Sequence, residues 1–179
     1  MIKKIVVIGP ESTGKSSLCE QLAEHFKTGW VREYAREYLL EHGTDYTYED
    51  LLEIAQGQIK NEDDAIHNAQ RTTHNSQLFI DTDLYVMKVW SEFVFNKCDN
   101  HILTQIANRK YDLYLLCNTD IPWVKDELRE YPDLNTREKL FYYYKDAMIN
   151  QHIQWVEVAG DYDQRLKTAI DAVESIYLK

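Results

Sequence analysis

Residues 3–16 of the chain read KKIVVIGPESTGKS, and this stretch decides the fold. Residues 3–8 are few, rich in β-branched side chains and apolar on both faces, which is typical of a parallel strand covered by helices. Residues 9–16 match the pattern Gly, four residues, Gly-Lys-Ser/Thr, whose backbone amides cradle phosphates. Residues 15–26 follow with apolar side chains at helical spacing. Because such a loop works between a strand and a helix, the stretch predicts an α/β fold with a phosphate site at its first strand.

The phosphate-binding loop predicts a nucleoside triphosphate ligand, with MgATP as the expected form. Lys15 is expected to reach the β and γ phosphates, and the Ser16 hydroxyl is expected to coordinate Mg²⁺. The helix that follows adds the positive end of its dipole. The residues expected at the nucleotide are Gly9, Glu11, Ser12, Thr13, Gly14, Lys15, Ser16 and Ser17.

Strands and helices are expected to alternate along the rest of the chain. The expected strands are 3–8, 29–32, 78–80, 111–117 and 153–158, and the expected helices are 15–26, 34–41, 48–70, 86–94, 137–150 and 161–178. This alternation predicts right-handed crossovers and about five parallel strands with helices on both faces, a P-loop kinase-like three-layer sandwich. With six Gly, three Pro and no linker, the chain is expected to form one domain over residues 1–179.

Composition restricts the class of protein. The 179 residues carry a formal net charge of −10, which argues against nucleic acid as a partner because the phosphate backbone would be repelled. Cys19, Cys98 and Cys117 have neither metal-ligand nor disulfide spacing, as expected for thiols in a reducing cytoplasm. No stretch approaches 18 apolar residues, so no membrane association is expected. The sequence gives no indication of the oligomeric state.

Two carboxylates follow the expected strand 78–80. Along a regular strand, Asp81 and Asp83 would project to the same side and suit Mg²⁺ or a sugar diol. Mg²⁺ is expected to be held by Ser16 with Asp81 or Asp83, of which Asp81 is preferred. Glu33 or an aspartate of the pair, of which Asp83 is preferred, is expected to position the acceptor hydroxyl in catalysis. The alternative is that the two aspartates cap the helix that follows. Glu33 and Arg36 follow the second expected strand, where they orient a substrate or simply form a surface ion pair.

A basic segment in this acidic chain is expected to be a lid over the triphosphate. It spans roughly residues 121–137 and carries Lys125, Arg129 and Arg137. Arg129 and Arg137 are expected to act in catalysis with Lys15, since an arginine on the γ-phosphate is worth about 10³–10⁵ in rate. The alternative is a solvated loop before the next helix. Residues 160–163 are expected either beside the nucleotide base or as a helix N-cap.

Residues 96–99 read Asn-Lys-Cys-Asp, a pattern that selects guanine in GTPases. That motif should follow a buried strand, whereas the residues before it here have helical spacing. A helix end or turn is therefore expected at this point. The chain also lacks the Asp-x-x-Gly element with which GTPases sense the γ-phosphate, so a GTPase is not expected.

Taken together, these elements resemble the ribosylnicotinamide kinase domain of the NadR family. The resemblance implies a P-loop kinase fold and ATP-dependent phosphorylation of a nucleoside 5′-hydroxyl, with nicotinamide riboside as the expected substrate. It also implies that Glu33, Tyr34, Arg36, Asp81 and Asp83 face the substrate and metal. The matching pieces, in the family's order, are the loop at 9–16, Glu-Tyr-Ala-Arg-Glu at 33–37, Ile-Asp-Thr-Asp at 80–83, Tyr-Asp-Leu-Tyr-Leu-Leu at 111–116, Asp-Ile-Pro-Trp-Val at 120–124 and Gly-Asp-Tyr at 160–162.

The chain departs from the family pattern at three points. It starts at the kinase strand without the His-x-Gly-His motif of a nucleotidyltransferase, so a standalone kinase is expected. Its lid keeps Arg129 but lacks the glycine of Asp-Gly-x-Arg. Arg32 stands where some members place an aromatic residue, so Trp30 or Trp123 is expected to stack on the substrate. A kinase for another small nucleoside or nucleotide, and a non-catalytic regulatory module that binds nucleotide, remain alternatives.

Overall fold

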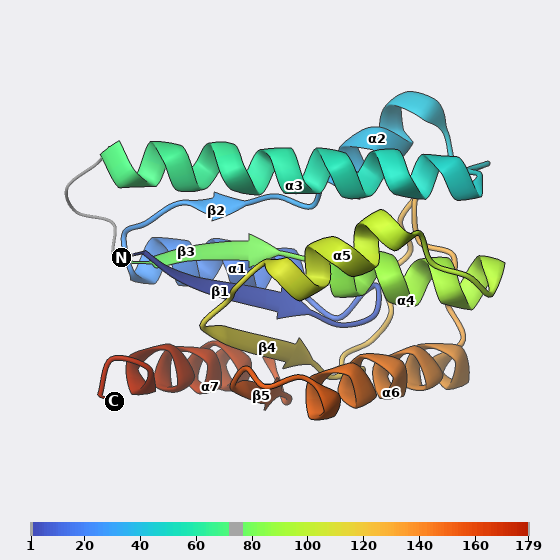
Figure 1. Ribbon diagram of the computed structural model, residues 1–179. Coiled ribbons are helices and arrows are strands. Elements are labelled where there is room, and N and C mark those ends of the chain that lie inside the picture. Colours follow the sequence, from blue (N-terminus) through green and yellow to red (C-terminus); the bar gives the residue numbers. More distant parts are fainter. Residues whose placement is uncertain (1, 72–76, 179) are drawn as a thin grey trace.

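A single parallel sheet forms the centre of the computed structural model, which describes residues 2–71 and 77–178 (Figure 1). Its five strands lie in the order β2-β3-β1-β4-β5, and each neighbouring pair is parallel. The order confirms the expectation of a parallel sheet built through crossover connections. The strands are β1 (Lys3–Ile8), β2 (Trp30–Val31), β3 (Gln77–Asp81), β4 (Leu113–Cys117) and β5 (Trp155–Val158).

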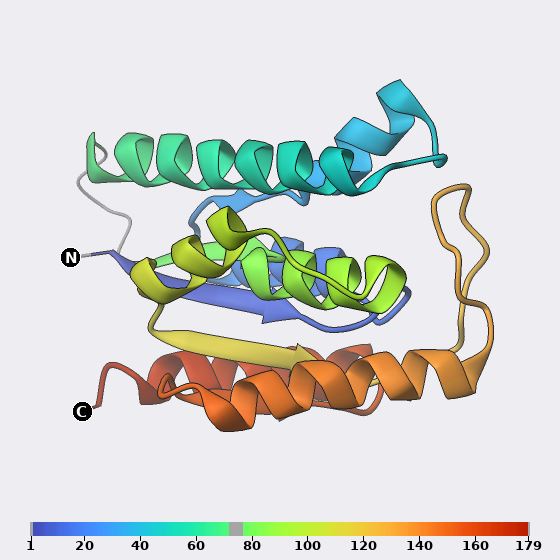
Figure 2. The same cartoon turned by 45° about the vertical axis from the view of Figure 1, so that its right-hand side comes forward.

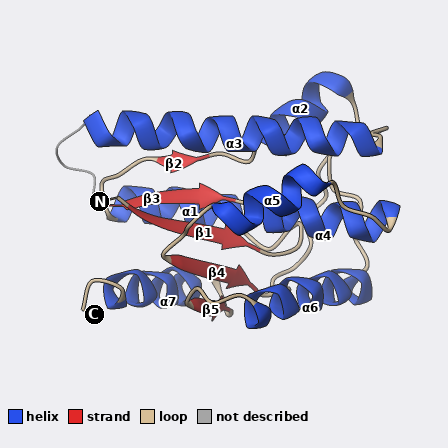
Figure 3. Ribbon diagram, in the orientation of Figure 1, coloured by secondary structure: helices blue, strands red, loops and turns tan. Residues whose placement is uncertain are grey.

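Seven helices connect and cover the strands of the described chain, as Figure 3 shows by colour. Six of them agree with the expected positions to within a few residues. The seventh, α5, lies in a stretch for which the sequence analysis predicts no element. The helices are α1 (Lys15–His25), α2 (Tyr34–His42), α3 (Tyr48–Arg71), α4 (Leu84–Phe95), α5 (Asn100–Asn108), α6 (Leu134–Asn150) and α7 (Tyr162–Ser175).

Both faces of the sheet are buried by helices, which gives three layers. In β1, Ile5 and Val7 pack into a cluster with α1 and α7. Val6 and Ile8 alternate with them and pack on the other face against α4 and α6. A further cluster joins α2, α3, α4 and α5 at the edge where β2 lies. The α/β three-layer arrangement with five parallel strands is therefore confirmed.

The carboxyl ends of the strands meet at one edge, because all the strands point the same way (Figure 1). The segment between β4 and α6 stands beyond this edge, as Figure 2 shows on the right. Within the sheet, Val7 of β1 pairs in register with Asp81 of β3. The phosphate-binding loop after β1 and the carboxylate that ends β3 are therefore neighbours.

The Asn-Lys-Cys-Asp stretch connects two helices, as expected from its helical spacing. Asn96 ends α4 in the left-handed conformation, with φ of 55°. The Asp99 side chain accepts a hydrogen bond from the backbone amide of His101 and begins α5. Because the stretch lies between two helices and does not follow a strand, it does not have the position of the guanine-binding motif of GTPases. No helix within residues 2–71 and 77–178 has the length and apolar character needed to cross a bilayer.

Candidate active site

The phosphate-binding loop, residues 9–16, folds tightly against the end of β4. Gly9 has φ of 142°, and a Cβ added there would lie 2.7 Å from the carbonyl oxygen of Cys117, so only glycine fits. Gly14 has φ of 76° and stands at the start of α1. Lys15 folds back along the loop, where its Nζ donates to the carbonyl oxygen of Pro10 at 2.9 Å. The loop thus places the lysine beside the backbone amides that would hold phosphates.

Ser16 and Asp81, the residues expected to hold the metal, lie in direct contact. The Ser16 hydroxyl donates to Oδ2 of Asp81, with 2.5 Å between the two oxygens. Asp81 is 1% exposed, and its Oδ1 has no hydrogen-bond partner among the described residues. Burial, with a contribution from the carboxylate of Glu33, raises the pKa of Asp81 to about 7. A buried carboxylate oxygen without a partner suits a cation, because the cation would offset its desolvation.

The donor set at this pair fits magnesium. No group of three or more His, Cys, Asp or Glu side chains that could hold a metal occurs in the part of the chain that the structure describes. Mg²⁺ does not need such a group, since it is usually held by one or two protein oxygens together with phosphate oxygens and water. Ser16 and Asp81 supply oxygens of this kind next to the phosphate-binding loop.

Asp83 does not lie with Asp81 as the sequence predicts. Strand β3 ends at Asp81, and Thr82 has φ of 67°, so the alternation of a strand does not extend to Asp83. The Asp83 carboxylate instead caps α4, accepting from the Tyr85 amide at 2.9 Å and the Tyr114 hydroxyl at 2.7 Å. Burial raises the pKa of Asp83 to about 7. The geometry therefore supports the helix-cap alternative and not the expected catalytic and substrate-binding role.

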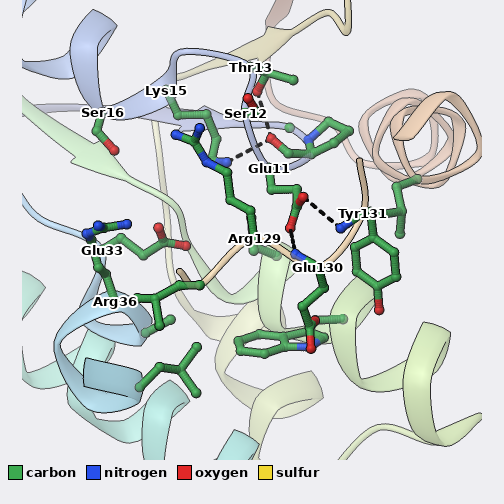
Figure 4. Close-up of a pocket in the computed structure, with 18 of the residues that line it drawn as sticks. Glu11, Ser12, Thr13, Lys15, Ser16, Glu33, Arg36, Arg129, Glu130 and Tyr131 are labelled. Carbon is green, nitrogen blue, oxygen red and sulfur yellow. Dashed lines mark hydrogen bonds between the residues drawn. The ribbon is translucent and has the colours of Figure 1, made fainter. Parts of the chain in front are cut away.

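A pocket extends from the phosphate-binding loop to α2, α4, α6 and residues 128–131 of the segment expected to form a lid, which is called the lid below. Glu33, which directly precedes α2, and Arg36 in its first turn both line it (Figure 4). The Arg36 guanidinium forms two hydrogen bonds, of 3.0 and 3.1 Å, to the carboxylate of Asp126 in the lid. Glu33 also lies close enough to Asp81 to raise its pKa. Of the residues predicted to bind the substrate, Glu33 and Arg36 thus share a cavity with the phosphate-binding loop.

The walls of this pocket are aromatic, but not through the expected residues. Tyr34 turns away, and its ring occupies the space beside Gly57 of α3. Neither Trp30 nor Trp123 lines the pocket, and Trp30 instead lies under the guanidinium of Arg32, 5.4 Å from the ring centre. The aromatic side chains that line the pocket are Tyr46, Trp90, Phe93, Tyr131 and Tyr144. These residues were not among the predicted site residues.

The lid is irregular from residue 121 to Asp133, and α6 begins at Leu134, before the expected start at 137. Arg129 lines the pocket, and Figure 4 shows its side chain extending toward Lys15. Arg137 lies within the helix and is 3% exposed. Its Nε and Nη1 have no hydrogen-bond partner among the described residues. The two arginines therefore come from different elements, one from the lid and one from α6.

Arg165 of α7, which the sequence analysis did not single out, ties the phosphate-binding loop to two neighbouring loops. It is 3% exposed and donates to the carbonyl oxygens of Thr13 at 2.9 Å, Asn118 at 2.9 Å and Gly160 at 2.8 Å. It also pairs with the carboxylate of Asp120. The only sequence signal for Arg165 is its position in the first turn of the last helix.

The loop after β5 forms the helix N-cap that was one of its two expected roles. Asp161 caps α7 by a reciprocal capping box with Gln164. Tyr162 stands beside the phosphate-binding loop, since a Cβ added at Gly14 would lie 3.5 Å from its ring. The same position would lie 3.4 Å from Ile121. Ile121 and the ring of Tyr162 therefore both lie beside Gly14 of the loop.

Comparison with known proteins places the chain in a family. A family described as an AAA domain matches residues 4–165, which is most of the chain. The chain belongs to this AAA-domain family. A P-loop domain of this kind agrees with the strand, loop and helix at residues 3–25.

The predicted resemblance to NadR is confirmed. The trifunctional NAD biosynthesis/regulator protein NadR of Escherichia coli is 28% identical over 180 residues, covering 98% of this chain and 43% of NadR. A solved structure of NadR protein in complex with NR matches with a TM-score of 0.81 at 24% identity, over 98% of this chain and 49% of that one. Thymidylate kinase from Ehrlichia chaffeensis matches with a TM-score of 0.66 at 12% identity, over 97% and 98%. The fold class is therefore that of P-loop kinases, and the chain spans less than half of NadR.

Proposed function

We propose that the chain transfers the γ-phosphoryl group of ATP to the 5′-hydroxyl of a nucleoside. The observation that carries the proposal is the shared pocket. The phosphate-binding loop with Lys15 forms one end, and Glu33 lies beside the Ser16–Asp81 pair. Such a pocket can hold a phosphoryl donor and a hydroxyl acceptor together, which is the main requirement of phosphoryl transfer.

The chemistry divides among the residues of this pocket. Glu33 orients the acceptor hydroxyl and accepts its proton, while the hydroxyl oxygen forms a bond to the γ-phosphorus. The bond between that phosphorus and the β,γ-bridging oxygen breaks, and ADP carries the electron pair away. Lys15 and Arg129 offset the negative charge of the transferring group. Arg137 does not line the pocket. It would add positive charge from α6, where two of its nitrogens are buried without protein partners among the described residues.

Ser16 and Asp81 would hold the magnesium ion of MgATP. When it is bound, Mg²⁺ neutralises phosphate charge and fixes the orientation of the phosphates. Ile121 and the ring of Tyr162 lie beside Gly14 of the loop and would supply an apolar surface for the adenine base.

The acceptor most compatible with the pocket is nicotinamide riboside, which would give nicotinamide mononucleotide. Its base is a cationic aromatic ring, and cations are attracted to the faces of aromatic side chains. Trp90, Tyr131 and Tyr144 supply such faces, and Glu33 and Glu130 supply negative charge. The resemblance to a NAD biosynthesis protein, and the NadR structure in complex with NR, support the same acceptor.

A panel of nucleosides with ATP and Mg²⁺, monitored for ADP release, tests the proposal. Turnover is expected with nicotinamide riboside and to a much smaller degree with uncharged nucleosides. Turnover only with another nucleoside would refute nicotinamide riboside as the acceptor but would still support a nucleoside kinase. ADP release that does not depend on any acceptor, or nucleotide binding without ADP release, would refute the kinase and favour a regulatory module.

A further inference from the structure

Glu11 lies in the phosphate-binding loop, but its side chain contacts the lid. One carboxylate oxygen accepts from the indole nitrogen of Trp123 at 3.0 Å and from the backbone amide of Tyr131 at 2.8 Å. The other accepts from the backbone amide of Glu130 at 2.8 Å. Figure 4 shows this carboxylate between the loop and the backbone of residues 130 and 131. The expected role of Glu11 at the nucleotide is therefore not the role its carboxylate has in this structure.

These contacts matter because the lid has no helix or strand between residues 121 and 133. Backbone amides in such a segment need partners from elsewhere, and hydrogen bonds to a charged acceptor are the strong ones. Glu11 supplies this acceptor to both limbs of the lid, one at Trp123 and the other at Glu130 and Tyr131. The lid is thus fixed to the loop by a side chain of the loop itself.

The contacts also flank the arginine of the lid. Arg129 is directly followed by the two residues whose amides Glu11 holds. On the other limb, the Ser12 hydroxyl accepts from the Val124 amide at 3.0 Å, and the Val124 carbonyl accepts from Nη1 of Arg129 at 2.5 Å. Hydrogen bonds therefore connect both the guanidinium of Arg129 and the backbone next to it to the phosphate-binding loop.

We propose that Glu11 is a positioning residue that acts through Arg129. By fixing both limbs of the lid, its carboxylate holds the Arg129 guanidinium over the phosphates and Tyr131 in the wall of the acceptor pocket. This role rests on the proposed kinase function for its catalytic consequence. Its structural part, a lid fixed by Glu11, does not depend on catalysis.

A double-mutant cycle tests the catalytic part. Glu11→Ala is expected to lower kcat by roughly tenfold or more, because Arg129 is then no longer held in place. A tenfold loss corresponds to about 1.36 kcal/mol of transition-state stabilisation. In the Arg129→Ala background, the same change should have little further effect, since the group it positions is already absent. Glu20→Gln, which removes a charge from the exposed face of α1, should match the unchanged protein. Multiplicative losses, or a rise in the KM of ATP or nucleoside with kcat unchanged, would overturn the role.

Limited trypsin digestion tests the structural part without activity. Lys125 and Arg129 are the trypsin sites of the lid between residues 121 and 133. Cleavage at these sites should be several-fold faster in Glu11→Ala than in the unchanged protein, because proteolysis follows the population of opened segments. Glu11→Gln keeps one acceptor oxygen and should fall between them. Unchanged cleavage in both variants, with melting temperatures showing that they are folded, would overturn the proposal even if the kinase is confirmed. Faster cleavage without any kinase activity would keep the lid contact and refute only the proposed function.

Discussion

The Ser16 hydroxyl donates a hydrogen bond to the Asp81 carboxylate across the gap between α1 and the end of β3, with 2.5 Å between Oγ and Oδ2. The register of the sheet favours this contact, since Val7, the residue before the last of β1, pairs with Asp81, the last residue of β3. The position of Asp81 is therefore set by the pairing of β3 with β1. Among the described residues, Ser16 and Asp81 are in contact, whereas Asp83, which was predicted to join them, is bonded to Tyr85 and Tyr114.

Replacement by asparagine should impair activity at Asp81 far more than at Asp83. Asp81→Asn removes a charged oxygen from the metal pair and should weaken the apparent Mg²⁺ affinity in the kinase assay by about 10–100-fold. Asp83→Asn should retain most activity, because asparagine is as good an N-cap as aspartate. A magnesium titration of kcat in both variants measures the difference. Equal loss in both, with melting temperatures unchanged, would restore a direct role for Asp83.

Arg129→Ala should mainly lower kcat. An arginine on a transferring phosphoryl group is worth about 10³–10⁵ in rate, whereas the nucleoside pocket keeps its aromatic walls. The KM of the nucleoside is therefore expected to change little. Lys125→Ala, at an exposed position of the same lid, serves as the matched control. A loss confined to nucleoside affinity would show that Arg129 binds the acceptor and not the phosphates.

Trp90 should determine how tightly the acceptor base binds. Aromatic stacking on a base contributes about 1–3 kcal/mol on alanine substitution. Trp90→Ala should accordingly raise the nucleoside KM by at least about fivefold, and Trp90→Phe should recover part of the loss. Trp30→Phe, outside the pocket, should have no effect. If Trp90→Ala leaves the nucleoside KM unchanged in a folded variant, the base binds elsewhere.

Asp50 should make stability depend on pH at the acid end. It accepts a hydrogen bond from the Tyr38 hydroxyl at 2.6 Å and two more from Thr47, which lowers its pKa to about 2. An aspartate in the unfolded chain has a pKa of about 3.9. The contribution of Asp50 to stability is therefore complete above that pH and is lost as the pH falls toward 2. Urea unfolding from pH 5 to 2 should show a shallower decline for Asp50→Asn. The exposed Asp45→Asn variant should decline like the unchanged protein, and an equal decline in Asp50→Asn would contradict the assignment.

The donor half of the site could be predicted because it depends on short stretches of sequence. The loop at 9–16 needs its glycines for backbone conformation, and parallel strands bring their carboxyl ends to one edge. These two facts are enough to place Lys15, Ser16 and Asp81 together. The prediction for Asp83 was wrong in placement because it assumed a regular strand through Thr82, whose φ of 67° ends the alternation.

The acceptor half could be predicted only in part. Glu33 and Arg36 follow β2 directly, so strand order was enough to bring them to the pocket. Trp90 and Tyr144 lie in the middle of helices, where an aromatic residue at helical spacing indicates burial and not a ligand. Which of these side chains faces the pocket depends on how α4 and α6 pack on the sheet. The Glu11 contacts depend in the same way on the path of an irregular lid.

Identification of the product tests the central claim most directly. The protein is incubated with ATP, Mg²⁺ and nicotinamide riboside, and the products are examined by mass spectrometry and ³¹P NMR, with Lys15→Ala and a sample containing EDTA as controls. The predicted result is one ADP for each nicotinamide mononucleotide, phosphorylated at the 5′-oxygen, and no product in either control. ADP with inorganic phosphate and no phosphorylated nucleoside, from this acceptor or any other, would contradict the assignment of a nucleoside kinase.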